Sequence, residues 1–385
     1  MVNVLEWVFW LSVAAVVMIT VGYPLFIGLV SPFVRKRTPA GGIEPRVTLI
    51  IAAYNEEKNI AAKLENSLLL DYPSDKLEII VASDGSSDGT NRIVEEFRAR
   101  GVQLAAFPRT GKTGCQNRVA RMASGEILVF SDANAAYDRA AIRMLVRNFA
   151  DPAIGGVCGQ LSYRVEGGGA GASEDAYWKY EKFIKSCESN LSSVLGANGS
   201  IYAVRKSGYV ELPEDLISDF VEPLAVVRNG HRFVYESEAV STEESSGSYG
   251  GEYRRKVRIL TRSIRGLLFM RGLMNPFRYG VFAIQLIMHK LLRFLTPVFL
   301  VSGALALLAL GVLGSYRWLL ACAVAGTAFA AWVATREGRE RANLVVRLCN
   351  FYFYYLMANY ALVLAWRNVL RGTRMTLWSP ERKGA

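Results

Sequence analysis

The sequence predicts an α/β domain built on a parallel sheet and joined to membrane-embedded helices. Three observations support this prediction. Short apolar runs alternate with helical patterns between residues 47 and 161, as in sheets whose strands are joined by crossover helices. Of the 385 residues, 51% are hydrophobic and the mean hydropathy is +0.19, so part of the chain is expected in lipid. Residues 4–30 form an apolar run long enough to cross ~30 Å of hydrocarbon.

The first segment, residues 1–34, is interpreted as a transmembrane anchor. It has neither a basic leader nor a clear small-residue cleavage site, which favours an anchor over a removed signal peptide. Arg35, Lys36 and Arg37 follow at once and are expected to lie in the cytoplasm. The net charge of +11 is partly this juxtamembrane excess and does not require a nucleic-acid partner.

Cysteine and histidine usage restricts the chemistry. The five cysteines are scattered without paired spacing, which argues against a disulfide framework or zinc site and fits a reducing compartment. The chain contains only His231 and His289. Acid–base work is therefore expected to fall to carboxylates.

Four apolar runs are predicted as buried strands after a Pro/Gly linker at residues 38–46. Asn55 is expected to cap the helix that follows the first strand, and a later helix is expected over residues 138–149. The predicted strands are Val47–Ala53, 77–82, Val102–Phe107 and the run beginning at Glu126, followed by another at 156–161.

Polar side chains follow three of these strands directly: Tyr54 and Glu56, then Asp84, then Asp132 with Asn134. Ligands of open α/β sheets bind outside the carboxyl ends of the strands. Oxygen donors there suit a hard divalent cation. An isolated Asp-Ala-Asn would more simply form a turn, but three such clusters on one rim indicate a site.

Two common nucleotide-binding motifs are missing from this rim. The loop containing Gly111 and Lys112 does not have the glycine spacing of a Walker loop. Ala-Ala-Tyr-Asn follows the first strand in place of a dinucleotide-binding glycine triplet. The rim is therefore expected to bind another kind of ligand.

Residues 47–57, 83–90 and 132–134 resemble the motifs of family-2 inverting glycosyltransferases. The resemblance implies a GT-A type nucleotide-diphosphosugar-binding domain, assigned to residues 45–250 and expected in the cytoplasm. Later motifs resemble membrane-integrated synthases of hyaluronan, chitin and cellulose.

This resemblance implies contacts with the donor and with Mg²⁺ or Mn²⁺. Asp132 and Asn134 would hold the metal, although Asn134 replaces the family's last Asp and a carboxamide binds such ions more weakly. Ser83 likewise stands where the family has a first carboxylate. The residues expected to bind the nucleotide sugar are Ala53, Tyr54, Glu56, Asp84, Lys112, Asp132, Arg255 and Arg258.

Asp219 matches the family's catalytic base, with Glu214 and Asp215 as alternatives if the register differs. A helix-capping role for Asp219 is compatible with this assignment. Asn198 and Gly199 lie in a Gly-Ala-Asn-Gly sequence that resembles an acceptor-side motif. A glycine-rich turn before a strand at 201–204 is the alternative interpretation.

Residues 251–293 are predicted to form basic amphipathic helices at the membrane interface. Arg255 and Arg258 resemble the arginines of the family's Gln/Arg-x-x-Arg-Trp motif and could both reach a diphosphate. Ile259 stands in place of the tryptophan of that motif. Because this tryptophan helps form the acceptor site in the family, the resemblance implies sugar transfer more strongly than processive elongation.

Residues 294–385 are predicted as a C-terminal transmembrane region with a basic tail. Spans are expected at 294–314 and 318–334. Residues 348–366 either cross the membrane or follow a re-entrant or interfacial path, which keeps the tail inside. Trp378 lies in a stretch that resembles the gating segment of related synthases and is expected on the acceptor side.

The sequence thus predicts a multi-pass enzyme of the inner membrane with a cytoplasmic catalytic domain. It would transfer sugar from a nucleotide diphosphate, with UDP expected, to a growing polysaccharide or glycolipid, with possible export or assembly partners. One alternative is single addition to a polyprenyl-linked acceptor. Another is a non-catalytic membrane scaffold. Donor sugar, linkage, acceptor and oligomeric state stay open.

Overall fold

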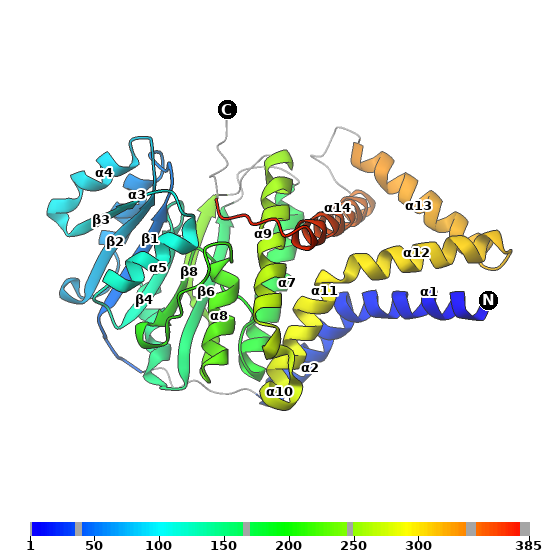
Figure 1. Cartoon of the computed structure of the whole chain (residues 1–385), viewed down its shortest axis with the longest axis horizontal. Helices are drawn as coiled ribbons and strands as arrows, with labels where there is room; N and C mark the ends of the chain where they lie inside the picture. Colours follow the sequence, from blue (N-terminus) through cyan, green and yellow to red (C-terminus); the bar gives the residue numbers. More distant parts are fainter. Residues whose placement is uncertain (1, 35–40, 165–169, 245–248, 336–343, 378–385) are drawn as a thin grey trace.

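The computed structural model describes residues 2–34, 41–164, 170–244, 249–335 and 344–377. Figure 1 shows an α/β domain at one side and a group of long helices that projects from it. The N-terminal helix lies at the far end of this projection, and the chain returns after the last helix toward the sheet. The predicted two-part organisation of sheet and apolar helices is therefore present.

One mixed sheet of eight strands forms the α/β domain, in the order β3-β2-β1-β4-β7-β6-β8-β5. The first four strands in this order are parallel, whereas β7 is antiparallel to both β4 and β6. The strands are β1 Val47–Ala53, β2 Leu77–Asp84, β3 Val102–Phe107, β4 Ile127–Asp132, β5 Ala136–Tyr137, β6 Ile154–Arg164, β7 Tyr202–Arg205 and β8 Arg232–Glu244.

The prediction of a wholly parallel sheet is wrong for β7 and β5, whereas β6 and β8 pair in parallel. Alternation of strands and helices enforces parallel strands only where each helix packs back across the sheet. The helix between β6 and β7, α7 (Ala170–Leu191), packs instead against α2 (Tyr23–Val34) as well as β8. The chain therefore re-enters the sheet at β7 in the opposite direction.

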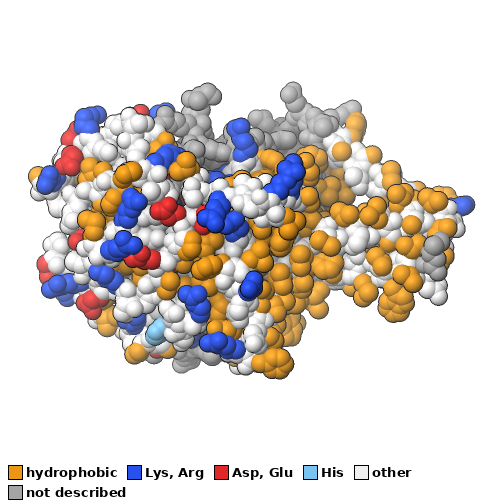
Figure 2. Space-filling view, viewed as in Figure 1, with side chains coloured by type: hydrophobic (Ala, Val, Ile, Leu, Met, Phe, Trp, Pro, Cys, Tyr) orange, Lys and Arg blue, Asp and Glu red, His pale blue; other side chains and the backbone are white. Residues whose placement is uncertain are grey.

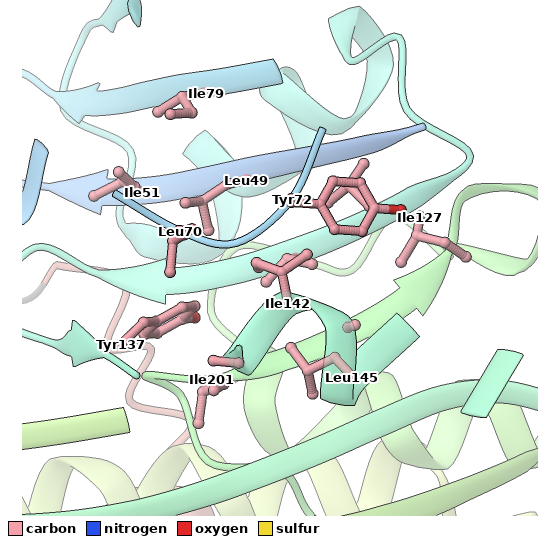
Figure 3. Packing of buried hydrophobic residues seen from close by; sticks show 14 of the residues in the cluster. Leu49, Ile51, Leu70, Tyr72, Ile79, Ile127, Tyr137, Ile142, Leu145 and Ile201 are labelled. Atoms are coloured by element: carbon pink, nitrogen blue, oxygen red, sulfur yellow. The ribbon is translucent and has the colours of Figure 1, made fainter. Parts of the chain in front are cut away.

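The core lies on both faces of the central strands. Every residue of β1 is buried, as expected for a strand covered by helices on both sides. Figure 3 shows Leu49 and Ile51 on one face, with Ile142 and Leu145 of α6 (Ala141–Val146) packed in the same cluster. The other helices of the domain are α3 Ile60–Leu68, α4 Thr90–Glu96, α5 Lys112–Met122 and α8 Ser218–Arg228.

Two predicted helix starts are wrong. Asn55 adopts a φ of 54°, and its Oδ1 accepts a hydrogen bond from the amide of Ser87 at 2.8 Å. Its side chain thus joins two loops, and α3 starts only at Ile60, whose amide donates to the carbonyl of Glu56. The helix predicted from residue 138 begins at Ala141, after a turn.

One helix among the described residues is by itself long and apolar enough to cross a membrane, Val2–Val34. It consists of α1 (Val2–Val17), a π-helical turn and α2. Pro276–Phe294 and α12 (Thr296–Val312) reach this length only as a pair bent by 55°. Figure 1 shows α12 beside α1, and Ser12 Oγ lies 3.0 Å from Ser302 Oγ between them.

The predicted later spans are helices, but they are less apolar or shorter. α13 (Arg317–Thr335) contains a shorter apolar helix, and α14 (Leu344–Leu370), which includes residues 348–366, falls outside the candidate spans found among the described residues. Figure 2 shows apolar side chains gathered over the helical projection and charged ones over the α/β domain. The multi-pass prediction therefore stays a prediction.

Helix α9 (Tyr249–Phe269) joins the two parts and packs against α14. It covers the first part of the basic stretch predicted over residues 251–293. The later part of that stretch forms α10 (Pro276–Gln285), a π-helical turn and α11 (Leu292–Phe294), and its location at the membrane interface stays a prediction.

A buried polar network fixes α7 to the helical projection. Glu188 of α7 accepts a hydrogen bond from the hydroxyl of Tyr23 at 2.7 Å, and His289 Nδ1 lies 2.7 Å from the same carboxylate oxygen. About one helical turn after His289, Arg293 forms an ion pair with Glu181 at 2.6 Å. Buried polar groups that bind one another in this way favour a single arrangement of the helices.

Candidate active site

The carboxyl ends of β1, β2 and β4 meet at one edge of the sheet. Ala53 is paired with Ser83 and Ala52 with Asp132, so the polar residues that follow these strands start at the same level. This arrangement follows from the parallel pairing of the three strands. The rim predicted from the sequence therefore exists.

Lys112 is central to this rim. It is the first residue of α5 and follows Gly111, whose φ of 92° turns the chain into the helix. Its ammonium group forms an ion pair with Asp132 and donates a hydrogen bond to the carbonyl of Gly199 at 3.2 Å. One cation thus connects the end of β4 with the loop predicted to face the acceptor.

Asp219 reaches the same place from the first turn of α8. A Cβ on Gly199 would lie 2.5 Å from Asp219 Oδ2 and 3.2 Å from Lys112 Nζ, so only glycine permits this close approach. Burial raises the pKa of Asp219, an effect opposed by the charge of Lys112 and reinforced by that of Asp132. A carboxylate with a raised pKa beside a cation is suited to accept a proton.

The two alternative bases do not lie beside this cation. Asp215 forms an ion pair with Arg265 at 2.7 Å. Glu214 faces α5 at Gly114, where a Cβ would lie 2.9 Å from Glu214 Oε1. Of the three acidic residues, Asp219 is the one within reach of Lys112.

Arg262 of α9 lies near Asp219, and its role was not predicted. The side chain is buried, donates to Thr113 Oγ1 at 3.2 Å and also binds the carbonyl of Leu216. Burial lowers the pKa of Arg262 to about 10, an effect that the charge of Asp219 opposes. The sequence could have indicated Arg262, because it lies four residues after Arg258 in the helically spaced arginines of α9.

Two further charged residues near Asp132 were missed. Glu243 on β8 is buried, and burial together with the charge of Asp132 raises its pKa, while Arg255 and Lys112 oppose this shift. Lys63 of α3 donates to the carbonyl of Ala135 at 2.6 Å, and burial lowers its pKa to about 7.

Asp84 holds the loop that carries Lys112. Its buried carboxylate accepts hydrogen bonds from the backbone amides of Thr110 at 2.6 Å and Gly111 at 3.0 Å. Bonds of this charge-assisted kind are the stronger ones in proteins. Asp84 therefore fixes the backbone that leads to Lys112, and its predicted contact with the nucleotide stays a prediction.

Tyr54 and Glu56 occupy different environments beyond β1. The guanidinium carbon of Arg109 lies 3.3 Å from the centroid of the Tyr54 ring, which places a cation and an aromatic face together at the rim. The buried carboxylate of Glu56 accepts a hydrogen bond from Asn59 Nδ2 at 2.7 Å. Glu56 thus stabilises the start of α3.

The remaining predicted residues lie around this centre or outside the described residues. Asn198 is buried, donates to the carbonyl of Gly159 at 2.6 Å and accepts from Lys185 of α7. Arg258 donates to the carbonyl of Leu377 at 3.4 Å. Arg255 is exposed one turn before it. Trp378 lies outside the described residues.

The metal prediction is compatible with the donors at the end of β4. Asp132 is partly exposed, and Asn134 is exposed in the turn that follows. No group of three or more His, Cys, Asp or Glu side chains that could hold a metal ion occurs within the described part of the chain. Two hard oxygen donors suit Mg²⁺ or Mn²⁺ when the other ligands come from substrate phosphates.

Comparison with known proteins relates this chain to glycosyltransferases. Residues 48–208 match the family described as "Glycosyl transferase family 2". The chain is 30% identical over 152 residues to the β-monoglucosyldiacylglycerol synthase of Synechocystis sp., and 27% identical over 223 residues to the poly-β-1,6-N-acetyl-D-glucosamine synthase of Staphylococcus aureus. These alignments cover 36% and 55% of this chain, and 32% and 53% of the two relatives.

One solved structure is similar over almost the whole chain. The mannosyltransferase PcManGT from Pyrobaculum calidifontis, in complex with GDP-Man and Mn²⁺, superposes with a TM-score of 0.71 over 95% of this chain and 100% of its own. The sequences are 22% identical, so the similarity concerns the fold. Residues 48–208 thus match glycosyltransferase family 2, and the chain has a GT-A-like fold.

Proposed function

We propose that the chain is a membrane-bound inverting glycosyltransferase that moves a sugar from a nucleotide diphosphate to a polysaccharide or glycolipid acceptor. The observation that carries the proposal is the meeting of Asp219, Lys112 and Asp132 around Gly199. It joins a base and a cation with a metal-binding carboxylate at the ligand-binding edge of the sheet.

Asp219 is the proposed base. It takes the proton of an acceptor hydroxyl as that oxygen forms a bond to the anomeric carbon, while the nucleotide diphosphate leaves from the opposite face. Inversion follows from this single displacement. The raised pKa of Asp219 brings the carboxylate closer to the pH at which it must accept a proton.

The leaving diphosphate needs positive charge. Lys112 lies beside the carboxylate of Asp132 and can turn toward the phosphates when a cation takes its place there. Arg255, exposed on α9, can approach from the other side. Mg²⁺ or Mn²⁺ bound by Asp132 and Asn134 would supply charge neutralisation of the diphosphate.

The membrane location rests on the helix Val2–Val34 and on the apolar surface of the helical projection (Figure 2). We place the α/β domain on the cytoplasmic side because Arg35, Lys36 and Arg37 follow this helix. UDP-sugars are the first donors to test. GDP-mannose belongs in the same screen, since it is the donor bound by the similar mannosyltransferase.

The test is a donor screen with the full chain in detergent, in which release of nucleoside diphosphate is measured. We expect Asp219→Asn to lower turnover about 10²- to 10⁴-fold, the usual contribution of a general base, while nucleotide affinity changes little. Asp75→Asn, an exposed change far from this edge, is the control. Unchanged turnover in Asp219→Asn would remove Asp219 as base.

A further inference from the structure

A cavity of about 480 Å³ opens between α9, α14 and the segment before α8. Its charged residues are Asp215, Arg265 and Arg374, and its walls are otherwise apolar. The apolar lining consists of Pro213, Leu216, Leu268, Phe269 and Val369. The cavity thus combines a cationic end with a hydrocarbon-like wall.

The cationic end carries an excess of positive charge. Arg265 forms an ion pair with Asp215 at 2.7 Å, and Arg374 Nε lies 4.0 Å from the same carboxylate. Two guanidinium groups therefore face one carboxylate. Arg265 Nε is also buried without a hydrogen-bond partner among the described residues. A fork of guanidinium donors matches the oxygens of a phosphate.

The apolar wall continues to the surface. Phe269 and Leu268, at the end of α9, are 51% and 39% exposed, and Leu370 beyond Val369 is 81% exposed. Large apolar side chains in such positions are costly to hydrate and favour contact with lipid. A free anion has no apolar surface to bury against this wall, whereas the hydrocarbon chain of a lipid does.

The cavity borders the proposed catalytic centre. Leu216 lines it, and the carbonyl of Leu216 binds Arg262, whose charge acts on Asp219. Arg262 and Arg265 are three residues apart on α9, about 4.5 Å along the helix axis. A group bound at Arg265 is thus about one helical turn from the surroundings of the base.

We infer that this cavity binds a lipid-linked acceptor through its phosphate-bearing headgroup. Arg265 and Arg374 hold the phosphate, Leu268 and Phe269 contact the hydrocarbon chain, and the free hydroxyl of the headgroup reaches toward Asp219. The inference rests on the proposed function, because it names the acceptor class for the same reaction.

The test measures lipid binding to the full chain in detergent by native mass spectrometry. The probe is dioleoyl phosphatidic acid, compared with dioleoylglycerol, which has the same chains without phosphate, and with inorganic phosphate, which has no chain. We expect phosphatidic acid to bind at least about tenfold more tightly than either comparison compound. Equal binding of dioleoylglycerol, or full competition by inorganic phosphate, would overturn the inference.

Three variants locate the bound lipid. We expect Arg374→Gln to weaken the binding of phosphatidic acid about fivefold. The loss is modest because the side chain of Arg374 is largely exposed. Leu268→Gln should weaken this binding by a similar factor. Arg371→Gln, an exposed arginine of the same segment that does not line the cavity, should leave it unchanged. Indistinguishable affinities of Arg374→Gln and Arg371→Gln would place the lipid elsewhere.

Nucleotide binding by the wild-type chain separates the two proposals. If calorimetry detects binding of the donor nucleotide but Arg374→Gln leaves the affinity for phosphatidic acid unchanged, only the acceptor inference fails. If no nucleotide binds, the proposed function fails as well.

Discussion

Gly199 lies against Asp219, and a side chain as small as a methyl group on the glycine would come within 2.5 Å of the carboxylate oxygen. Real Cβ atoms do not approach that closely. The position of the proposed base therefore depends on the absence of a side chain twenty residues away.

Gly199→Ala should displace Asp219 and lower turnover. A shift of about 1 Å at a reacting group can cost about 10²-fold in rate, and we expect a loss of that order. Steady-state kinetics on the full chain measures it. Gly208→Ala is the matched control, because a Cβ there meets no atom within 4 Å. Equal rates for both variants would mean that Asp219 does not act where the structure places it.

Lys112→Gln should move the acid limb of the pH–rate profile to higher pH. The raised pKa of Asp219 means that the base is lost as pH falls through this pKa, and the charge of Lys112 holds the pKa down. Removal of that charge raises the pKa of Asp219 further. Lys76→Gln, which breaks an exposed ion pair with Glu44, should leave the profile unchanged. An acid limb that stays in place, or moves to lower pH, would contradict the proposed coupling.

Asp84→Asn should loosen the loop before Lys112. The carboxylate accepts amide hydrogen bonds from Thr110 and Gly111, and loss of its charge weakens both. We expect hydrogen exchange at these two amides to rise about tenfold and turnover to fall, with Asp75→Asn as the exposed control. Unchanged exchange at both amides would show that Asp84 does not hold this loop.

Asn134→Asp should tighten binding of Mn²⁺ or Mg²⁺. A second carboxylate beside Asp132 adds a charged ligand, and the exposed turn can accept it. We expect about a tenfold gain in metal affinity by calorimetry in the presence of nucleotide. Asn229→Asp, at an exposed helix end, provides the control. An equal response of the two variants would argue against a metal site at Asn134.

The sequence predicted the first half of the sheet well because local patterns determine it. β1 and β3 have the predicted bounds, and the polar residues after β1, β2 and β4 do share one edge. Parallel neighbours make this outcome almost unavoidable. The reversed direction of β7 depends on how α7 packs against α2, a long-range contact that periodicity does not report.

The candidate site shows the same limit. Asp219 lies beside Lys112 and Asp132, and its role as base stays a prediction. Glu243 and Arg262 were missed because each lies in a segment with an ordinary strand or helix pattern, and only the fold brings them near Asp132 and Asp219. Glu56 was assigned to the donor although its carboxylate binds Asn59.

Helix α7 connects two regions that would otherwise be independent. Lys185 binds Asn198 beside the proposed catalytic centre. Glu188, less than one turn later on α7, binds Tyr23 and His289 of the helical projection. A tilt of the N-terminal helix would therefore be transmitted to the loop that contains Gly199. The thickness of the surrounding bilayer, which sets that tilt, then becomes a physical variable that the rate of sugar transfer should follow.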